Sequence, residues 1–205
     1  MQFSCLSTDT LNSHELYFDI SYPTLPILSR RRFTIEREKN SISRSSSSLI
    51  YSVAMIGAGI LSQYRPLQHV CYHLARKYLE MCELDDDSSD LASINVFQAL
   101  VFIIRYEITN NRLERAWMTL GRAIRLAKLL NLHRMDQVET ACVDGSKLGL
   151  SLPPTDDPAL LEERRRSFWG LYILESYACT RTGMPSHLGE AQVRTPLSNL
   201  YVTKV

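Results

Sequence analysis

The chain has 205 residues, of which 45% are apolar and 22% are charged, and these values are ordinary for a globular domain with one sizeable core. Its formal net charge is +1, whereas a domain that grips a nucleic-acid backbone on its own is usually far more basic, so direct DNA binding by this chain is not expected. The five cysteines contain no C-x-x-C pair, so they predict neither a disulfide framework nor a zinc cluster, and they suit a reducing intracellular compartment.

The first residues predict a short helix followed by an extended segment. Residues 11–20 can form the helix, with Asn12 or Ser13 as its N-cap, because short polar side chains accept hydrogen bonds from the free backbone N–H groups of a first turn. Pro23 and Pro26 disfavour helical geometry in the residues before them, and they therefore impose an extended connection.

Two polar stretches follow and predict surface loops. Arg30–Arg32 is expected to lie in a solvated loop, since the alternative, a nuclear-import signal, needs a longer basic run to be specific. Residues 36–48 end in four consecutive serines, a composition typical of a loop or linker. We therefore expect residues 1–48 to form an entry helix and a proline- and serine-rich loop, and residues 49–205 to form a helical domain.

The middle of the chain predicts three successive helices. Residues 49–62 are small and apolar, as in a buried helix, and Pro66 suits the first turn of the next helix. Residues 91–109 are apolar on nearly all sides, which indicates a central helix, because their length disfavours the alternative of a strand. The second of these helices is expected to bury a face formed by Leu67, Val70, Cys71, Leu74, Tyr78 and Met81.

A helical hairpin is expected next, because Asn110–Asn111 breaks the central helix and an amphipathic helix follows at once. Gly121 and the alanines of this helix should allow a neighbouring helix to approach closely. His133 and Arg134 lie at its C-terminal end, where cations complement the helix dipole. Its apolar stripe consists of Ala116, Leu120, Ala123, Ile124, Ala127 and Leu130.

The last predicted helix begins at Asp157–Pro158, an N-cap followed by a proline in the first turn. Glu162–Glu163 precedes Arg164–Arg166, an order that suits the helix dipole and allows ion pairs between residues three or four apart. Gly183–Pro185 ends the helix. Since no region is rich in strand patterns, we predict an all-α, multi-helix domain with long connecting loops.

Two patterns suggest chemistry but fall short of a site. Residues 53–62 look like the glycine turn of a dinucleotide-binding fold. However, Ser62 takes the third small position, and Pro66 interrupts the helix that would bind the phosphates. We therefore favour the alternative, a helix packed through its small residues. His69 and His73 are four apart on one helix face, as in helical zinc pairs, but no glutamate adjoins the first and no third ligand is evident. We therefore expect no catalytic, cofactor-binding or metal-binding residue and no enzyme activity.

Several motifs, in a shared order, resemble the middle homology region of fungal zinc-cluster transcription factors, also called the fungal-specific transcription factor domain. Residues 16–33 are similar to its entry motif, residues 49–59 to its first apolar helix, and Gly183-Met184-Pro185 stands where the family often has Gly-Arg-Pro. Both tryptophans of its strongest motifs are expected to be mainly buried. The residues that match these motifs, and that we expect to be structural, are Trp117, Gly121, Arg122, Ala123, His133, Arg134, Phe168 and Trp169.

The resemblance implies a nuclear regulatory domain that controls DNA-templated transcription by RNA polymerase II. The family's six-cysteine module, which binds zinc and DNA, is missing from these residues, and the domain is expected to be incomplete at its C-terminal end. Expected partners are other transcription-regulatory proteins, the rest of the same factor, and a small-molecule effector; no membrane association is expected, because no apolar stretch could span a bilayer. The alternative is a helical protein-interaction scaffold of the tetratricopeptide type.

A regulatory contact surface is expected at the two ends of the last helix. Three consecutive arginines cannot all point to one side of a helix, so at least one should face an acidic partner. The alternative is pairing within the domain, with Glu162, Glu163 or the Asp85–Asp87 segment. The candidate surface consists of Arg164, Arg165, Arg166, Gly183 and Pro185.

Overall fold

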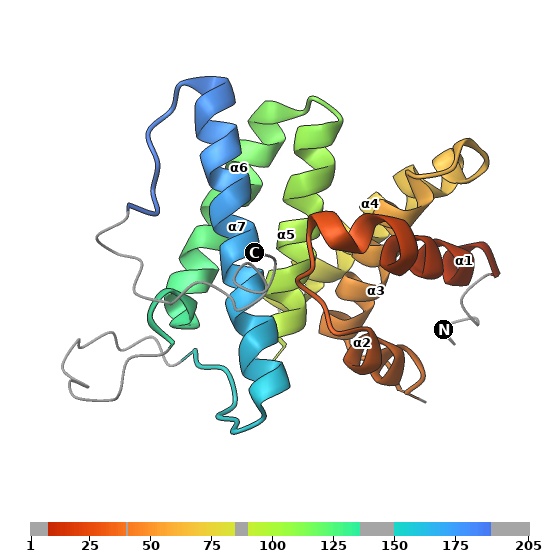
Figure 1. The fold of residues 1–205 in the computed structure, drawn as a ribbon, viewed down its shortest axis with the longest axis horizontal. Helices are drawn as coiled ribbons and strands as arrows, with labels where there is room; N and C mark the ends of the chain where they lie inside the picture. Colours follow the sequence, from red (N-terminus) through yellow and green to blue (C-terminus); the bar gives the residue numbers. More distant parts are fainter. Residues whose placement is uncertain (1–7, 40, 85–89, 136–149, 190–205) are drawn as a thin grey trace, which may run out of the picture.

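The computed structural model describes residues 8–39, 41–84, 90–135 and 150–189, and these residues form seven α-helices and no strand (Figure 1). The prediction of an all-α, multi-helix domain is therefore confirmed. In chain order the helices are α1 (Thr8–Leu16), α2 (Arg30–Arg37), α3 (Arg44–Ala58), α4 (Arg65–Glu83), α5 (Ile94–Thr109), α6 (Leu113–Leu129) and α7 (Pro158–Thr182).

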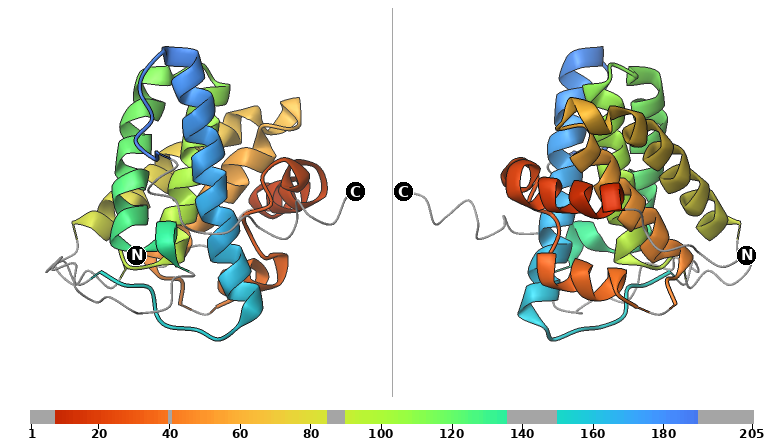
Figure 2. Two further views of the ribbon diagram at one scale, coloured as in Figure 1. Left: turned by 60° about the vertical axis from the view of Figure 1, so that its left-hand side comes forward. Right: turned by 90° about the vertical axis from the view of Figure 1, so that its right-hand side faces the viewer.

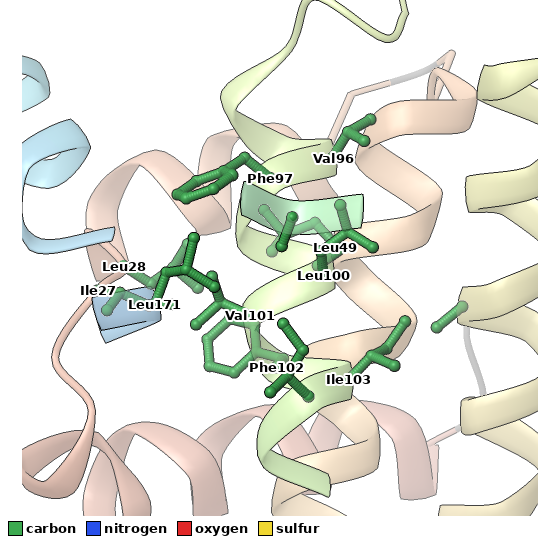
Figure 3. Packing of buried hydrophobic residues seen from close by; sticks show 14 of the residues in the cluster. Ile27, Leu28, Leu49, Val96, Phe97, Leu100, Val101, Phe102, Ile103 and Leu171 are labelled. Carbon is green, nitrogen blue, oxygen red and sulfur yellow. The ribbon is translucent and has the colours of Figure 1, made fainter. Parts of the chain in front are cut away.

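Helix α5 forms the centre of the domain and packs against α3, α4, α6 and α7. Figure 3 shows its side chains between Leu49 of α3 on one side and Ile27, Leu28 and Leu171 on the other. An enclosed helix needs apolar residues on nearly all sides, which is the pattern that predicted a central helix here. Its buried apolar side chains are Ile94, Val96, Phe97, Ala99, Leu100, Val101, Phe102, Ile103, Ile104 and Tyr106.

Helices α6 and α7 stand side by side against α5 (Figure 2). The apolar stripe predicted for α6 is confirmed, since each of its six members is at most 5% exposed. The close approach expected at Gly121 is wrong: a Cβ there would meet only the Arg125 side chain, at 3.5 Å. Trp117 and Trp169 are both mainly buried, as predicted, although neither is fully enclosed.

Helix α1 crosses α3 at Gly57, and this glycine is the point of closest approach between the two helices. A Cβ at Gly57 would lie 1.7 Å from the backbone oxygen of Ser13, far inside van der Waals contact. Residues 53–58 are helical and buried, so the glycine pattern serves helix packing. The interpretation of this stretch as a helix packed through small residues is confirmed for residues 53–58.

The serine run does not form the predicted surface loop, because Ser45–Ser48 lies buried inside the first turns of α3. Ser43 is the N-cap, and its Oγ accepts a hydrogen bond from the backbone N–H of Ser46 at 3.1 Å. The hydroxyl of Ser46 in turn donates to Glu36 at 2.7 Å. Serine favours caps as well as loops, so composition alone gave the wrong assignment.

Two other N-terminal predictions are also corrected. Helix α1 begins at Thr8, so Asn12 and Ser13 lie inside it, and the Ser13 hydroxyl donates back to the oxygen of Asp9 at 2.8 Å instead of capping the helix. Arg30–Arg32 forms the first turn of α2 rather than a loop, because Ser29 caps that helix.

Helix α4 buries a face rotated from the predicted one. Val70, assigned to the buried stripe, is 52% exposed, whereas Tyr72 is 1% exposed. A three- and four-residue pattern fits several rotations of a helix that carries aromatic residues on two sides. The buried residues of α4 are Cys71, Tyr72, Ala75, Tyr78, Leu79 and Cys82.

The helix lengths do not favour the tetratricopeptide alternative. Across the described part of the chain they range from 8 residues in α2 to 25 in α7, and no helix pair recurs with a fixed length. Within the same residues, no helix is long and apolar enough to cross a membrane.

Acid should weaken the fold through His14, which is fully buried between α1 and α3. Its Nε2 lies 3.0 Å from the oxygen of Ile50, and because a carbonyl only accepts, Nε2 carries the proton. Its buried Nδ1 has no hydrogen-bond partner, so a second proton would create an unpaired buried charge. Burial lowers the pKa of His14 from 6.5 to about 4, with Arg37 adding to the effect, although the hydrogen bond to Ile50 opposes it.

Between pH 6.5 and about 4, His14 therefore binds a proton in the unfolded chain but not in the folded chain. The free energy of unfolding falls as the pH drops across this range. At about 1.4 kcal/mol for each pKa unit, the loss reaches about 3 kcal/mol. Urea unfolding across this range, for the wild type and His14→Gln, measures it. The variant should show a flatter pH dependence, and an identical slope in both proteins would contradict the assignment.

Candidate regulatory site

The three consecutive arginines lie in the second turn of α7 and bond in different directions. Arg164 donates to the oxygen of Pro153 at 2.7 Å, while Arg165 and Arg166 both pair with Glu162, at 2.7 and 3.0 Å. Each arginine therefore has a partner within the domain, but only Arg165 and Arg166 pair with one of the acidic residues weighed as the alternative to an external contact. The Asp85–Asp87 segment, the other predicted partner, lies outside the described residues.

Arg164 is buried to a degree that its sequence position does not reveal. It is 8% exposed, and its Nε is buried without a hydrogen-bond partner. Burial, together with the nearby charge of Arg32, lowers the pKa of its guanidinium. Arg164 therefore anchors the Pro153 segment to α7, and Arg166, whose side chain is 25% exposed, is the member of the triplet most open to a partner.

Glu163, beside the triplet, forms the centre of a buried polar network. Its two oxygens accept hydrogen bonds from Nη2 and Nε of Arg32, at 2.6 and 2.9 Å, in a bidentate pair. Gln98 of α5 donates to the same carboxylate at 2.9 Å. The Glu163 side chain is 3% exposed, so the carboxylate lies almost out of water, and its hydrogen bonds join α2, α5 and α7.

A cleft of about 240 Å³ opens beside this network. It lies between the start of α7 and the extended segment that precedes α2, so the predicted entry motif and the arginine motif meet at one place. Cationic and anionic groups both line it, which suits a polar or charged partner. Its walls include Tyr22, Pro26, Ile27, Arg30, Glu162 and Arg166.

Gly183 caps the C-terminal end of α7, as predicted. Gly183 has φ of 70°, a left-handed conformation that favours glycine, and its N–H donates to the oxygen of Cys179 at 2.8 Å. Pro185 is exposed. From Arg165 to Gly183 the helix rises by roughly 27 Å, so the structure does not bring the two halves of the candidate surface together.

A buried carboxylate holds the segment after Gly183 against α7. Glu175 accepts hydrogen bonds from the backbone N–H groups of His187 and Leu188, at 2.6 and 3.2 Å, and its side chain is 1% exposed. The His187 ring packs against Trp117, with ring centroids 5.3 Å apart. Both side chains line a small cavity of about 140 Å³ whose lining also includes Gly121. The strongest predicted motif and the terminal turn therefore share one surface.

The other motif residues pack or pair within the domain. Arg122 forms an ion pair with Glu83 of α4, and Ala123 and Phe168 are fully buried. Burial, with help from the charges of Arg134 and Lys128, lowers the pKa of His133.

A third buried carboxylate, Glu107 of α5, was missed from the sequence. It is fully buried and accepts hydrogen bonds from Tyr72 at 2.7 Å, from Thr119 at 2.8 Å and from Arg76 at 3.0 Å. A groove of about 760 Å³ runs beside it between α4 and α6. The sequence did contain a sign of this network, because Glu107 is the one acidic residue of a largely apolar helix. A buried charge without a partner is energetically costly, so such a residue must have one.

Among the described residues, no three histidine, cysteine, aspartate or glutamate side chains gather closely enough to hold a metal ion.

Comparison with known proteins identifies similar domains. Residues 15–201 match the family model described as fungal specific transcription factor domain. The chain is 48% identical, over 90% of its length and 30% of the relative's, to the depudecin biosynthesis cluster-specific transcription activator DEP6 of Fusarium langsethiae. The DEP6 protein of Alternaria brassicicola is 45% identical over 90% of this chain and 29% of the relative.

A more distant relative, the ascochitine biosynthesis cluster transcriptional regulator of Didymella fabae, is 30% identical over 89% of this chain and 30% of its own length. The chain thus spans less than a third of the length of these relatives. No solved structure matches it.

Proposed function

Because the chain belongs to the fungal specific transcription factor domain family, we propose that it is a regulatory domain acting in the nucleus on DNA-templated transcription by RNA polymerase II. The observation that carries the proposal is the family match over residues 15–201. The names of its relatives, which are activators specific to biosynthesis clusters, point to genes of one such cluster as the regulated set.

The domain acts through contacts with proteins rather than with DNA. Its net charge of +1 is too small for a surface that grips phosphates, and its five cysteines cannot form the six-cysteine zinc cluster that reads DNA in this family. In this family, zinc-dependent DNA recognition belongs to the six-cysteine module. The partners are other transcription-regulatory proteins, the rest of the same factor, and a small-molecule effector that biases the contact.

The contact surface lies around Arg166 and the neighbouring cleft, with the Gly183–Pro185 turn as a second, separate surface. Arg166 keeps a quarter of its side chain exposed while Glu162 fixes its direction. An arginine held in one orientation loses little conformational freedom when a carboxylate binds it, so it suits recognition of an acidic partner.

Arg166→Glu should change the transcription of a reporter gene in a fungal host when the 205-residue chain is fused to a DNA-binding module and an activation segment. Melting temperature should shift by only about 2 °C, because the change affects a partly exposed ion pair. Arg31→Glu, an equal charge change at an exposed position of α2, is the control and should leave the reporter unchanged. If reporter transcription changes only in proportion to the loss of thermal stability, or by the same amount in both variants, the surface around Arg166 is not the regulatory contact.

A further inference from the structure

Two histidines of α4 bring their ring nitrogens together on the outer face of the domain. His69 and His73 are one helical turn apart, and both are exposed. Their Nε2 atoms lie 3.2 Å apart, with ring centroids separated by 4.4 Å and ring planes inclined by 64°. Two nitrogen lone pairs that point at each other repel, so this distance fits one of two arrangements: one ring donates an N–H···N hydrogen bond to the other, or both nitrogens bind one metal ion.

We propose that His69 and His73 form a two-histidine chelating site for a divalent transition metal of the zinc class. Zinc–imidazole bonds are about 2.05 Å long, so a metal placed equally far from two nitrogens 3.2 Å apart subtends an angle of roughly 100°. This value is close to the tetrahedral angle that zinc prefers. The observed separation of the two nitrogens therefore fits the bite of a metal chelate.

The packing of His73 favours this geometry. Its ring meets the Tyr72 ring edge-on, with centroids 5.4 Å apart and planes inclined by 75°. Tyr72 is 1% exposed and is fixed by its hydrogen bond to Glu107 at 2.7 Å. One of the two ligands thus rests on a rigid support, which reduces the entropy lost on chelation.

The site is open. No third protein ligand lies close by among the described residues, so water or a ligand from another molecule completes the coordination. Arg76, one turn along α4, would repel a metal, but it pairs with Glu107 at 3.0 Å. The site uses no cysteine and is therefore separate in chemistry from the zinc cluster of the family's DNA-binding module.

Zinc binding to the purified 205-residue chain tests the proposal. Isothermal titration with Zn²⁺ alone, at micromolar concentrations, should show one ion per chain, and zinc should raise the melting temperature because it binds the folded state. His69→Ala should weaken binding at least about tenfold, since one imidazole loses the advantage of chelation. It should also abolish the thermal shift.

The matched control keeps the number of histidines but changes their spacing. In Val70→His/His73→Ala, the two histidines are adjacent in sequence and point to different sides of the helix. Val70 is 52% exposed, so the fold should tolerate the change, and its melting temperature without zinc checks this. We expect this variant to bind zinc as weakly as His69→Ala. Equal zinc affinity in the wild type and the spacing variant, or no binding to the wild type, would show that the pair shares a proton only.

Discussion

Replacing Gly57 with alanine is expected to cost at least about 3 kcal/mol of folding free energy, or to prevent folding. The added methyl carbon would lie 1.7 Å from the backbone oxygen of Ser13 and 2.6 Å from its carbonyl carbon. Because both obstacles are backbone atoms, no side-chain rotation can relieve the clash, and α1 must separate from α3. Such a separation would expose the apolar surface that these helices share.

Gly121→Ala is the matched control, because it places the same methyl group in the interior of another helix. Its nearest neighbour would be the flexible Arg125 side chain at 3.5 Å, so the change should be neutral or stabilising by up to about 1 kcal/mol. Urea unfolding followed by circular dichroism measures both variants. A Gly57→Ala protein as stable as Gly121→Ala would mean that α1 does not cross α3 at this point.

Glu163→Gln is expected to cost about 3 kcal/mol, because it leaves the Arg32 guanidinium without its counter-ion in a largely dry site. The amide would also turn an N–H donor toward groups that already donate, Arg32 and Gln98. The value falls at the lower end of the range for broken buried pairs because the Arg32 side chain remains 21% exposed. Glu162→Gln, at the neighbouring and more exposed carboxylate, should cost less than about 1 kcal/mol.

A double-mutant cycle isolates this interaction. Arg32→Met should also destabilise the domain, and Arg32→Met combined with Glu163→Gln should be more stable than the sum of the single effects by at least about 1 kcal/mol. Additive effects, or a Glu163→Gln cost no larger than that of Glu162→Gln, would show that the pair does not lock α2 to α7.

The all-α class and the packing of α5 and α6 followed from residue patterns. The stripe of α6 repeats at three- and four-residue steps, and α5 is apolar on nearly all sides, so burial left a clear signature in both. The face of α4 was placed wrongly at Val70, because its tyrosines and histidines made more than one rotation compatible with the pattern.

Long-range polar pairing could not be predicted from the sequence. Arg32 and Glu163 are 131 residues apart, and no local rule selects them from the other arginines and glutamates. The serine run was misassigned for a related reason: Ser46 is buried because it meets Glu36 of another helix. Composition describes a segment, whereas burial depends on what the fold places opposite it.

The candidate surface was predicted as a set of residues but not as an arrangement. The sequence placed Arg164–Arg166 near the start of one helix and Gly183–Pro185 at its end, yet it could not show that Arg164 is buried and Arg166 partly open. Likewise, the contact of Trp117 with His187 depends on the fold of the segment after α7, which Glu175 holds in place.

The most direct test of regulation by this domain compares reporter transcription with and without it. Three proteins would be expressed in a fungal host at matched levels. Each contains a DNA-binding module joined to an activation segment, and it is fused to the intact chain, to the Gly57→Ala chain, or to neither. Reporter messenger RNA should differ between the intact chain and no chain, and Gly57→Ala should abolish that difference, because the effect needs the folded domain. Equal messenger RNA in all three would contradict a regulatory role.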